Sequence, residues 1–372
     1  MANYKAALAA LLTIFLFSAL AVYSISFVLP KFIAKFGGLA SFAIPLSWIG
    51  GAIGGLLMGI FGDAKGRRLS LLISILLFVF PLIGNIIVNN IVVFYIIWFL
   101  IGFGVNAVNG ISYVYAAELS PPNVRGLVGS IMQGLYFLGA IMGSLISFAA
   151  RESISLYYVT IFSLSAISIP LWFLIPESKW RAKFSFKVSR DLAKATVFGS
   201  LFSIGAFLLL VPLVSLGFTL FTALGLNAYA VILAGFIIGM IGFTAAGSIS
   251  DRIGRKRASY VFAGISVLAS LLFLFGVNNP NLVATSFILL MFGSSFFAYF
   301  GVWMSEVYPA NFKATGTNIT LFLGRLLGGG FGVTLALLLP FGLERDLSLT
   351  ALISSTIVLL SATQLPETVR AK

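Results

Sequence analysis

The sequence contains no cysteine and no histidine among its 372 residues. Disulfides, metal sites built from cysteine and histidine, thiol chemistry and histidine acid–base catalysis are therefore excluded. The sequence predicts no cofactor and no metal site. An enzyme is disfavoured for the same reason, because the usual acid, base and metal-binding groups have no candidates within the membrane.

Charged residues are also scarce, at 9% of the chain, whereas 60% of the residues are hydrophobic and the mean hydropathy is +1.10. This composition does not fit a soluble globular domain. A helix that crosses a bilayer needs about 20 apolar residues, so the chain has room for roughly twelve and little more. We therefore predict an all-α membrane protein with spanning helices at Ala6–Leu29, Phe42–Phe61, Leu69–Val88, Ile91–Ala117, Gly126–Ala149, Leu156–Ile175, Thr196–Leu216, Ala228–Ile249, Ala258–Val277, Leu282–Ser305, Thr315–Leu339 and Leu349–Leu365.

The net charge of +13 comes from 23 lysine and arginine residues against ten acidic residues. An even number of helices puts both termini on one side, and 18 of the 23 basic residues then lie on that side. This bias is the positive-inside rule. It predicts a multi-pass protein of the cell (plasma) membrane with cytoplasmic termini, whose basic loops face anionic lipid rather than nucleic acid. A monomer is the expected form.

Two short charged turns organise the chain. FGDAKGRRLS at 61–70 and ISDRIGRKRA at 249–258 match at an offset of 188 positions, as do ELSPPNVRG from Glu118 and EVYPANFKATG from Glu306. PESKWR from Pro176 and PETVR from Pro366 match at an offset of 190. Because the offsets are about half the chain, they indicate a duplicated unit. We predict two six-helix bundles, at 1–176 and 196–372, joined by a cytoplasmic linker at 177–195.

Arg325 is the one charged residue predicted inside an apolar span. It lies about ten residues into its helix, or roughly 15 Å at 1.5 Å per residue, which is near the middle of the membrane. All ten acidic residues are in loops or at helix ends. Because an intramembrane arginine is costly and faces a cavity or a partner, we favour a water-filled cavity that receives an anionic ligand. The alternative is a structural lock, in which Arg325 reaches helix-end carbonyls or Glu118.

Asn106, Asn109 and Tyr113 share one helix face, since they recur at i, i+3 and i+7. Polar side chains inside a membrane require water, a partner helix or a ligand. Interhelical hydrogen bonding is worth only about 0.6 kcal/mol on average in membrane proteins. Hydrogen bonding between helices and ligand binding therefore stay equal alternatives for this face.

The repeated turns and the twelve helices together resemble the major facilitator superfamily over essentially the whole chain. GDAKGRR at 62–68 is similar to the signature turn of that family, and SDRIGRKR at 250–257 is similar to its second copy. The motifs at Glu118–Gly126, Pro176–Ser178, Glu306–Gly316 and Pro366–Thr368 are similar to the branch of sugar porters and organic-acid or metabolite symporters. Within that branch, GRLLG at Gly324–Gly328 is more similar to the organic-acid symporters.

The resemblance implies a secondary active or facilitative transporter that moves a small polar metabolite by alternating access between two bundles. The implied substrate is an organic anion such as a carboxylate, or a sugar-like solute. The alternative is a transporter-like receptor that binds a small ligand without translocating it. The chain departs from the sugar porters in three places: 201–210 lacks the glutamine pair of their seventh helix, the tenth helix lacks their proline–tryptophan motif, and the first helix lacks the acidic residue of the proton-coupled members. A coupling proton or cation and uniport both stay open.

The resemblance also implies roles for single residues. Gln133 lies eight positions after Arg125, where sugar porters place a sugar-binding glutamine. The candidate substrate-binding residues are Gln133, Arg325, Asn106, Asn109, Tyr113, Tyr299 and Tyr23. The candidate gating residues are Asp63, Arg67, Arg68, Glu118, Arg125, Asp251, Arg255, Arg257, Glu306 and Lys313.

The gating residues are expected to act in two ways. Asp63 and Asp251 would each cap a helix N-terminus in the opposite half, because a carboxylate is favoured at the positive end of a helix dipole. Glu118 and Glu306 would pair with the nearby arginines and lysine, closing the cytoplasmic side until the carrier opens inward. The alternative is that these charges only set the topology.

Overall fold

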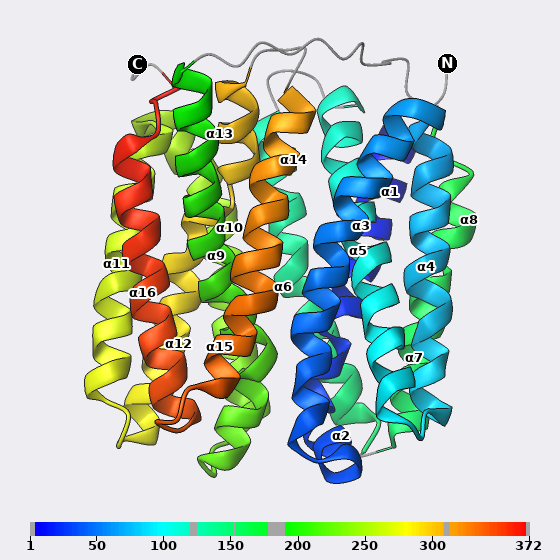
Figure 1. The fold of residues 1–372 in the computed structure, drawn as a ribbon, viewed down its shortest axis with the longest axis vertical. Helices are drawn as coiled ribbons and strands as arrows, with labels where there is room; N and C mark the ends of the chain where they lie inside the picture. The colour runs from blue at the N-terminus through cyan, green and yellow to red at the C-terminus, as the bar shows by residue number, and fades with distance from the viewer. Residues whose placement is uncertain (1–3, 120–124, 152, 178–189, 309–312, 370–372) are drawn as a thin grey trace. The chain divides into compact units, whose positions relative to one another are not determined.

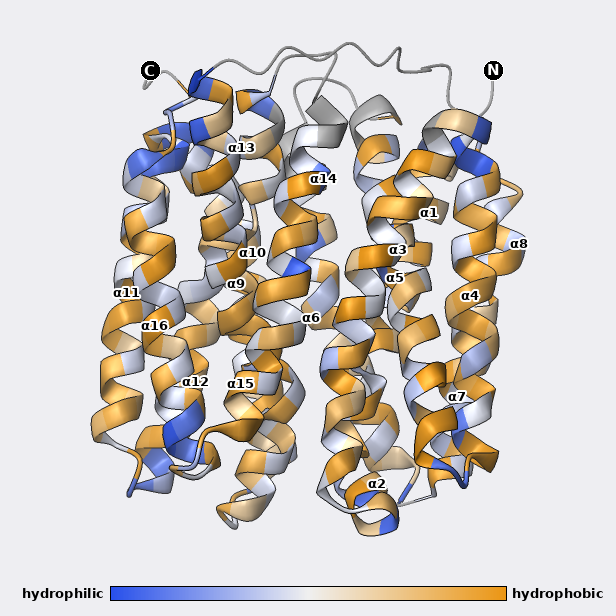
Figure 2. Ribbon diagram, viewed as in Figure 1, coloured by the Kyte–Doolittle hydropathy of each residue, from blue (hydrophilic) through white to orange (hydrophobic). Residues whose placement is uncertain are grey.

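The computed structural model describes residues 4–119, 125–151, 153–177, 190–308 and 313–369. Within these ranges every regular element is helical, and twelve helices are long and apolar enough to cross a membrane. Figure 2 shows apolar residues along most of each helix, with many of the strongly hydrophilic residues near helix ends. The predicted all-α membrane fold with twelve spanning helices is confirmed.

Contacts between Cα atoms divide the chain into two units. The first unit comprises residues 1–125 and 135–182, and the second comprises 126–134 and 183–372. In each unit the long helices run side by side (Figure 1).

The first unit contains eight α-helices and two 3₁₀ segments in its described part. In chain order they are α1 (Tyr4–Tyr23), η1 (Ser24–Phe27), α2 (Leu29–Phe36), η2 (Gly38–Phe42), α3 (Ala43–Lys65), α4 (Arg67–Ile87), α5 (Ile91–Leu119), α6 (Arg125–Ala149), α7 (Ile154–Ala166) and α8 (Ser168–Trp172). The stretch 126–134 of α6 groups with the second unit.

The second unit contains the remaining helices. They are α9 (Arg190–Ala223), α10 (Ala228–Ile253), α11 (Arg255–Phe275), α12 (Pro280–Gly293), η4 (Ser294–Phe297), α13 (Phe300–Val307), α14 (Lys313–Leu323), the π-helix η5 (Gly324–Phe331), α15 (Gly332–Leu338) and α16 (Leu343–Gln364).

Several helix boundaries differ from the sequence prediction. Helix α9 begins at Arg190, inside the stretch predicted as a linker. Helices α4 and α11 begin at Arg67 and Arg255, so these arginines lie in first helical turns rather than in the preceding loops. Four spans predicted as continuous helices, at Ala6–Leu29, Leu156–Ile175, Leu282–Ser305 and Thr315–Leu339, are interrupted.

The first span shows how an interruption is tolerated in a membrane. Regular α-helix stops at Tyr23 and gives way to η1, which frees backbone carbonyls from the helical pattern. The Tyr157 hydroxyl donates to the Ser24 carbonyl at 2.9 Å, and the Ser147 hydroxyl donates to the Phe27 carbonyl at 3.2 Å. Because lipid offers no hydrogen bonds, such partners from neighbouring helices are needed wherever a spanning helix breaks.

Glycines bring α3 and α5 into close contact in the first unit. A Cβ atom placed on Gly102 would lie 1.7 Å from the Ser47 carbonyl oxygen, and one on Gly54 would lie 2.3 Å from the Phe103 carbonyl oxygen. Small residues at a helix interface allow this approach and so replace the hydrophobic driving force that lipid removes. This packing fixes the position of α5, which carries Asn106, Asn109 and Tyr113 on one face.

We expect Gly102→Ala to lower the free energy of unfolding by about 1–3 kcal/mol, because the added methyl group forces α3 and α5 apart. Gly59→Ala on α3 is the matched control, since a Cβ atom there meets no atom within 4 Å. Thermal unfolding of the purified protein, followed by tryptophan fluorescence, measures both variants. Equal melting temperatures for the two variants would contradict the packing argument.

Candidate functional site

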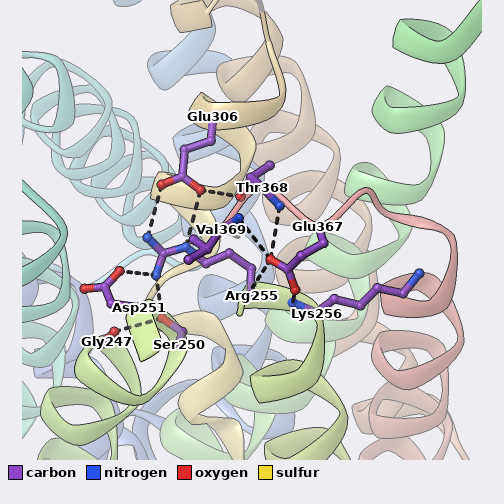
Figure 3. Close-up of polar contacts among 9 residues, drawn as sticks. All are labelled: Gly247, Ser250, Asp251, Arg255, Lys256, Glu306, Glu367, Thr368 and Val369. Atoms are coloured by element: carbon purple, nitrogen blue, oxygen red, sulfur yellow. Dashed lines mark hydrogen bonds and ion pairs between the residues drawn. The ribbon is translucent and has the colours of Figure 1, made fainter. Parts of the chain in front are cut away.

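Glu367 binds the N-terminus of α11 in the second unit. Its Oε1 accepts a hydrogen bond from the Arg255 backbone N–H at 2.9 Å, and its Oε2 accepts one from the Lys256 N–H at 3.0 Å (Figure 3). The first N–H groups of a helix have no partner within the helix and form its positive end, so a carboxylate is stabilised there. The Trp303 indole donates to the Pro366 carbonyl at 2.9 Å and holds the turn that carries Glu367.

The first unit contains the same arrangement. The Oε1 atom of Glu177 accepts from the Arg67 N–H at 3.0 Å and from the Arg68 N–H at 3.3 Å, at the start of α4. The Tyr115 hydroxyl donates to the Pro176 carbonyl at 3.0 Å. The sequence duplication therefore corresponds to a duplicated structural device, in which the glutamate after the sixth span of each unit caps the third span.

Each cap needs a glycine immediately before the helix it closes. Gly66 and Gly254 have φ angles of 117° and 97°, a region that side chains with a Cβ atom avoid. A Cβ atom on Gly254 would also lie 2.4 Å from Oε2 of Glu367, and one on Gly66 would lie 3.0 Å from Oε2 of Glu177. The glycine of each signature turn thus gives the carboxylate access to the helix end.

The Arg255 side chain, only 4% exposed, lies between two carboxylates (Figure 3). Its Nη1 is 2.7 Å from Oδ1 of Asp251, one turn earlier. Its Nη2 and Nε bind the two carboxylate oxygens of Glu306, at 3.1 and 3.3 Å. The Ser250 hydroxyl accepts a further bond from Nη1 at 2.5 Å. A bidentate arginine–carboxylate pair of this kind fixes the relative orientation of the two side chains as well as the distance between them.

The ion pair predicted between Glu306 and Arg255 is therefore present. This ion pair connects α11 to α13. The Thr368 hydroxyl also donates a hydrogen bond to Glu306, so the segment after α16 belongs to the same cluster. Arg257, by contrast, is exposed. Whether the cluster opens and closes during a functional cycle stays a prediction.

The other predicted gating residues are described only in part. Arg67 is 8% exposed. The Arg68 guanidinium lies 4.4 Å from the centre of the Trp172 ring, and the Trp172 indole donates back to the Arg68 carbonyl at 2.7 Å. The following side chains lie outside the described part of the structure: Asp63, Glu118, Arg125 and Lys313. Asp251 pairs within its own unit, and its predicted cap on the opposite half stays a prediction.

A chain of hydrogen bonds joins three helices in the first unit. The Ser18 hydroxyl on α1 donates to Oδ1 of Asn109 on α5 at 3.0 Å, and Nδ2 of Asn109 donates to the Tyr136 hydroxyl on α6. Ser18 and Asn109 are fully buried. For Asn109 the structure therefore shows hydrogen bonding between helices. Sequence reasoning left Ser18 and Tyr136 out of the site, although Tyr136 lies three positions after Gln133 and so shares its helix face.

Aromatic rings surround this chain of hydrogen bonds. Phe15 contacts Tyr113 and Tyr136, with ring centres 5.8 and 5.3 Å apart. Tyr23 contacts Tyr136 and Trp48, with ring centres 6.1 and 6.3 Å apart. The structure thus places Tyr23 and Tyr113, two of the predicted candidates, in one aromatic cluster around Asn109. Phe15 and Trp48 also belong to this cluster, although the sequence did not single them out.

Asn106 and Gln133 are buried, at 0% and 5% exposure. The Nδ2 atom of Asn106 donates to the Gly102 carbonyl of its own helix at 3.2 Å. Its Oδ1 has no hydrogen-bond partner among the described residues. Gln133 lies on α6, in the part that groups with the second unit.

Arg325 and Tyr299 are buried in the second unit, at 3% and 1% exposure. Arg325 is the second residue of the π-helix η5. The Tyr299 hydroxyl lies 3.0 Å from the Ser259 hydroxyl, one turn beyond Arg255 on α11. Among the described residues, no group of three or more histidine, cysteine or acidic side chains could hold a metal ion.

The family model of the Major Facilitator Superfamily matches residues 11–333. The chain belongs to this superfamily. The match covers most of both units and agrees with the duplicated turns and the twelve spanning helices. The protein is therefore a multi-pass membrane protein of this superfamily.

Solved structures match the fold of this chain over nearly its whole length. The proton:xylose symporter XylE bound to 6-bromo-6-deoxy-D-glucose matches with a TM-score of 0.80 and 17% identity, over 98% of this chain and 96% of that one. A partially occluded inward-open form of the xylose transporter XylE from E. coli matches with a TM-score of 0.78 and 17% identity, over 99% of both chains.

Curated relatives match over shorter regions. A protein of Haemophilus influenzae named as a metabolite transport protein is 28% identical over 131 residues, which is 34% of this chain and 32% of that protein. A probable 4-methylmuconolactone transporter of Cupriavidus pinatubonensis is 26% identical over 195 residues, which is 52% of this chain and 45% of that protein. Each match spans less than half of the relative's own length.

We expect Glu367→Ala and Glu177→Ala each to lower the free energy of unfolding by roughly 0.5–2 kcal/mol, because each removes a carboxylate cap from a helix N-terminus. Hydrogen exchange should accelerate at residues 255–257 in the first variant and at residues 67–69 in the second. Mass spectrometry of the exchanged protein locates the change.

Gln364→Ala is the control for both variants, because its side chain is exposed and bonds only its neighbour Thr363 in the described structure. Faster exchange spread over the whole chain, or exchange at the two helix starts that matches the control, would contradict a local capping role.

Proposed function

We propose that this transporter carries a small organic anion across the plasma membrane and binds its acidic group at Arg325. The observation that carries the proposal is a guanidinium only 3% exposed within a membrane span. An ionisable side chain inside a membrane is costly in free energy. Such residues pair with another group or line the path of a substrate or ion. The planar guanidinium matches a carboxylate with two parallel hydrogen bonds.

The first unit by itself offers neutral polar candidates for substrate contacts. Asn106 offers an acceptor oxygen with no partner among the described residues. Tyr23 and Tyr113 belong to the aromatic cluster around Asn109. Gln133 and Tyr299, which group with the second unit, are the remaining candidates. A buried amide and aromatic rings suit the uncharged part of a small metabolite.

Transport proceeds by alternating access, with both termini in the cytoplasm. The Arg255 cluster acts as a cytoplasmic latch, whose ion pairs form in one state and break in the other. The structural neighbours are proton symporters, whereas the span Tyr4–Phe27 contains no acidic residue. A coupled proton would therefore need another carboxylate, and Glu306, 29% exposed at its side chain, is the candidate in the described structure.

A sugar-like solute is the second candidate substrate. It is favoured by Gln133, which matches a sugar-binding position of the sugar porters, and by the xylose transporters among the structural neighbours. The relative named for a lactone and the buried arginine favour the anion. A receptor that binds without transport has no specific observation in its favour.

Ligand binding to the purified protein tests the proposal. We expect a small carboxylate to raise the melting temperature, because a ligand present at 100 times its dissociation constant stabilises a protein by about 2.7 kcal/mol. Arg325→Gln should weaken that affinity about 10- to 100-fold, since a hydrogen bond to a charged group is worth about 1.5–3 kcal/mol. Arg257→Gln is the matched control, because Arg257 is exposed on α11.

A screen of carboxylates and sugars at two pH values separates the two candidates. A sugar that stabilises both the wild type and Arg325→Gln, but not Gln133→Ala, would make the substrate sugar-like and Arg325 structural. Carboxylate binding that is the same in the wild type and in Arg325→Gln would overturn the proposed anion site.

A further inference from the structure

The eleventh span changes its helical geometry at its centre. It runs as α14, then as the π-helix η5 from Gly324 to Phe331, then as α15. A π-turn closes its hydrogen bond one residue later than an α-turn and so contains one extra residue. Such segments are rare and occur frequently at functional sites. Arg325 lies inside this one.

The corresponding helix of the first unit has no such segment. The offset of 188 positions matches Arg325 to Phe137, on α6, which is regular α-helix from Arg125 to Ala149. The same fold is therefore built in the first unit without a π-turn. The π-geometry belongs to the copy that carries the buried arginine, and the architecture of the unit does not require it.

Glycines hold η5 directly against α9. A Cβ atom on Gly324 would lie 2.0 Å from the Ser203 hydroxyl oxygen, and one on Gly328 would lie 2.3 Å from the Ile204 carbonyl oxygen. Four of the eight residues of η5 are glycine, so side chains do little to fix its register. Because glycine has no side chain, this face of η5 can shift along α9, whereas larger side chains would interlock with α9 and prevent the shift.

Several buried hydroxyl groups of α9 and α14 have no hydrogen-bond partner among the described residues. Ser200 and Ser203 on α9 and Thr317 on α14 have buried hydroxyl oxygens that bond no described residue. Buried hydroxyls are normally hydrogen bonded, so each exception calls for an explanation. A second arrangement of the same two helices, in which these hydroxyls find partners, supplies one.

We propose that the eleventh span is a two-register element, in which η5 converts between π- and α-geometry and thereby turns Arg325. Removing one extra residue from a turn rotates one side of a helix by about 100° relative to the other, because an α-helix has 3.6 residues per turn. Arg325 then faces a different direction from the one it has in the π-register. This switch rests on the proposed function, since it regulates the site that receives the anion.

The absence of native cysteine makes the register measurable with spin labels. One pair of labels, at Leu201→Cys on α9 and Leu327→Cys in η5, reports the register; both positions are partly exposed. A second pair, at Leu268→Cys on α11 and Leu360→Cys on α16, lies outside the eleventh span and serves as the control. Distances are measured by electron spin resonance in lipid nanodiscs.

Deleting Gly329 removes the extra residue and should leave only the α-register. The Leu201–Leu327 distance should then move to a second value, while the control distance stays unchanged. If the deletion variant fails to fold, the double variant Gly329→Ala, Gly330→Ala takes its place, because alanine favours the α-helix over a glycine-rich turn. In the wild type, saturating benzoate should shift the populations between the same two distances.

The outcomes separate the switch from the proposed function. A Leu201–Leu327 distance in the variants that differs from the wild-type distance, with no effect of benzoate and no binding of any carboxylate, would uphold the switch and refute the anion site. Benzoate that raises the melting temperature while one Leu201–Leu327 distance persists in the wild type and both variants would overturn the switch. A control distance that changes as much as the reporter distance would also overturn it.

Discussion

The structure depends on one constraint, which is that the interior of a membrane supplies no hydrogen bonds. Every backbone group freed from a helix, and every charge within a span, must therefore find a partner in the protein. The described structure meets this demand with side chains from neighbouring helices. The Tyr157 and Ser147 hydroxyls, for example, donate hydrogen bonds to the carbonyls of Ser24 and Phe27 in η1.

The two halves share their turns closely because each turn performs the same three tasks. Each signature turn must reverse the chain, start a new helix and admit a carboxylate to the end of that helix, all within a few residues. A glycine with positive φ and a glutamate from a distant segment perform this task in both units. The equivalent arginines of the two turns, Arg67 and Arg255, are both buried, at 8% and 3% exposure.

Much of the fold could be predicted from the sequence, because apolar length and charge placement follow directly from the bilayer. The twelve spans and the superfamily are examples. The interruptions could not be predicted, because η1 depends on hydroxyls that arrive from α6 and α7, and the π-geometry of η5 depends on its packing against α9. Apolar composition is the same for a regular span and for a broken one.

The candidate site was predictable only in part, for a related reason. The face shared by Asn106, Asn109 and Tyr113 follows from helical periodicity, and Arg325 is conspicuous as a charge in an apolar span. Ser18 and Trp48 carry no such signal, because a single serine or tryptophan is common in any helix. Glu177 and Glu367 were recognised as parts of motifs, but their capping role depends on contacts across more than 100 positions of sequence.

Exchange of labelled substrate across a membrane tests the central claim most directly. The purified protein is reconstituted in liposomes loaded with unlabelled benzoate, and the entry of labelled benzoate is followed over time. The account predicts exchange above that of protein-free liposomes, lost in Arg325→Gln and retained in Arg345→Gln, which changes an exposed arginine of α16. Exchange of labelled xylose instead of benzoate, at equal rates in the wild type and Arg325→Gln, would contradict it.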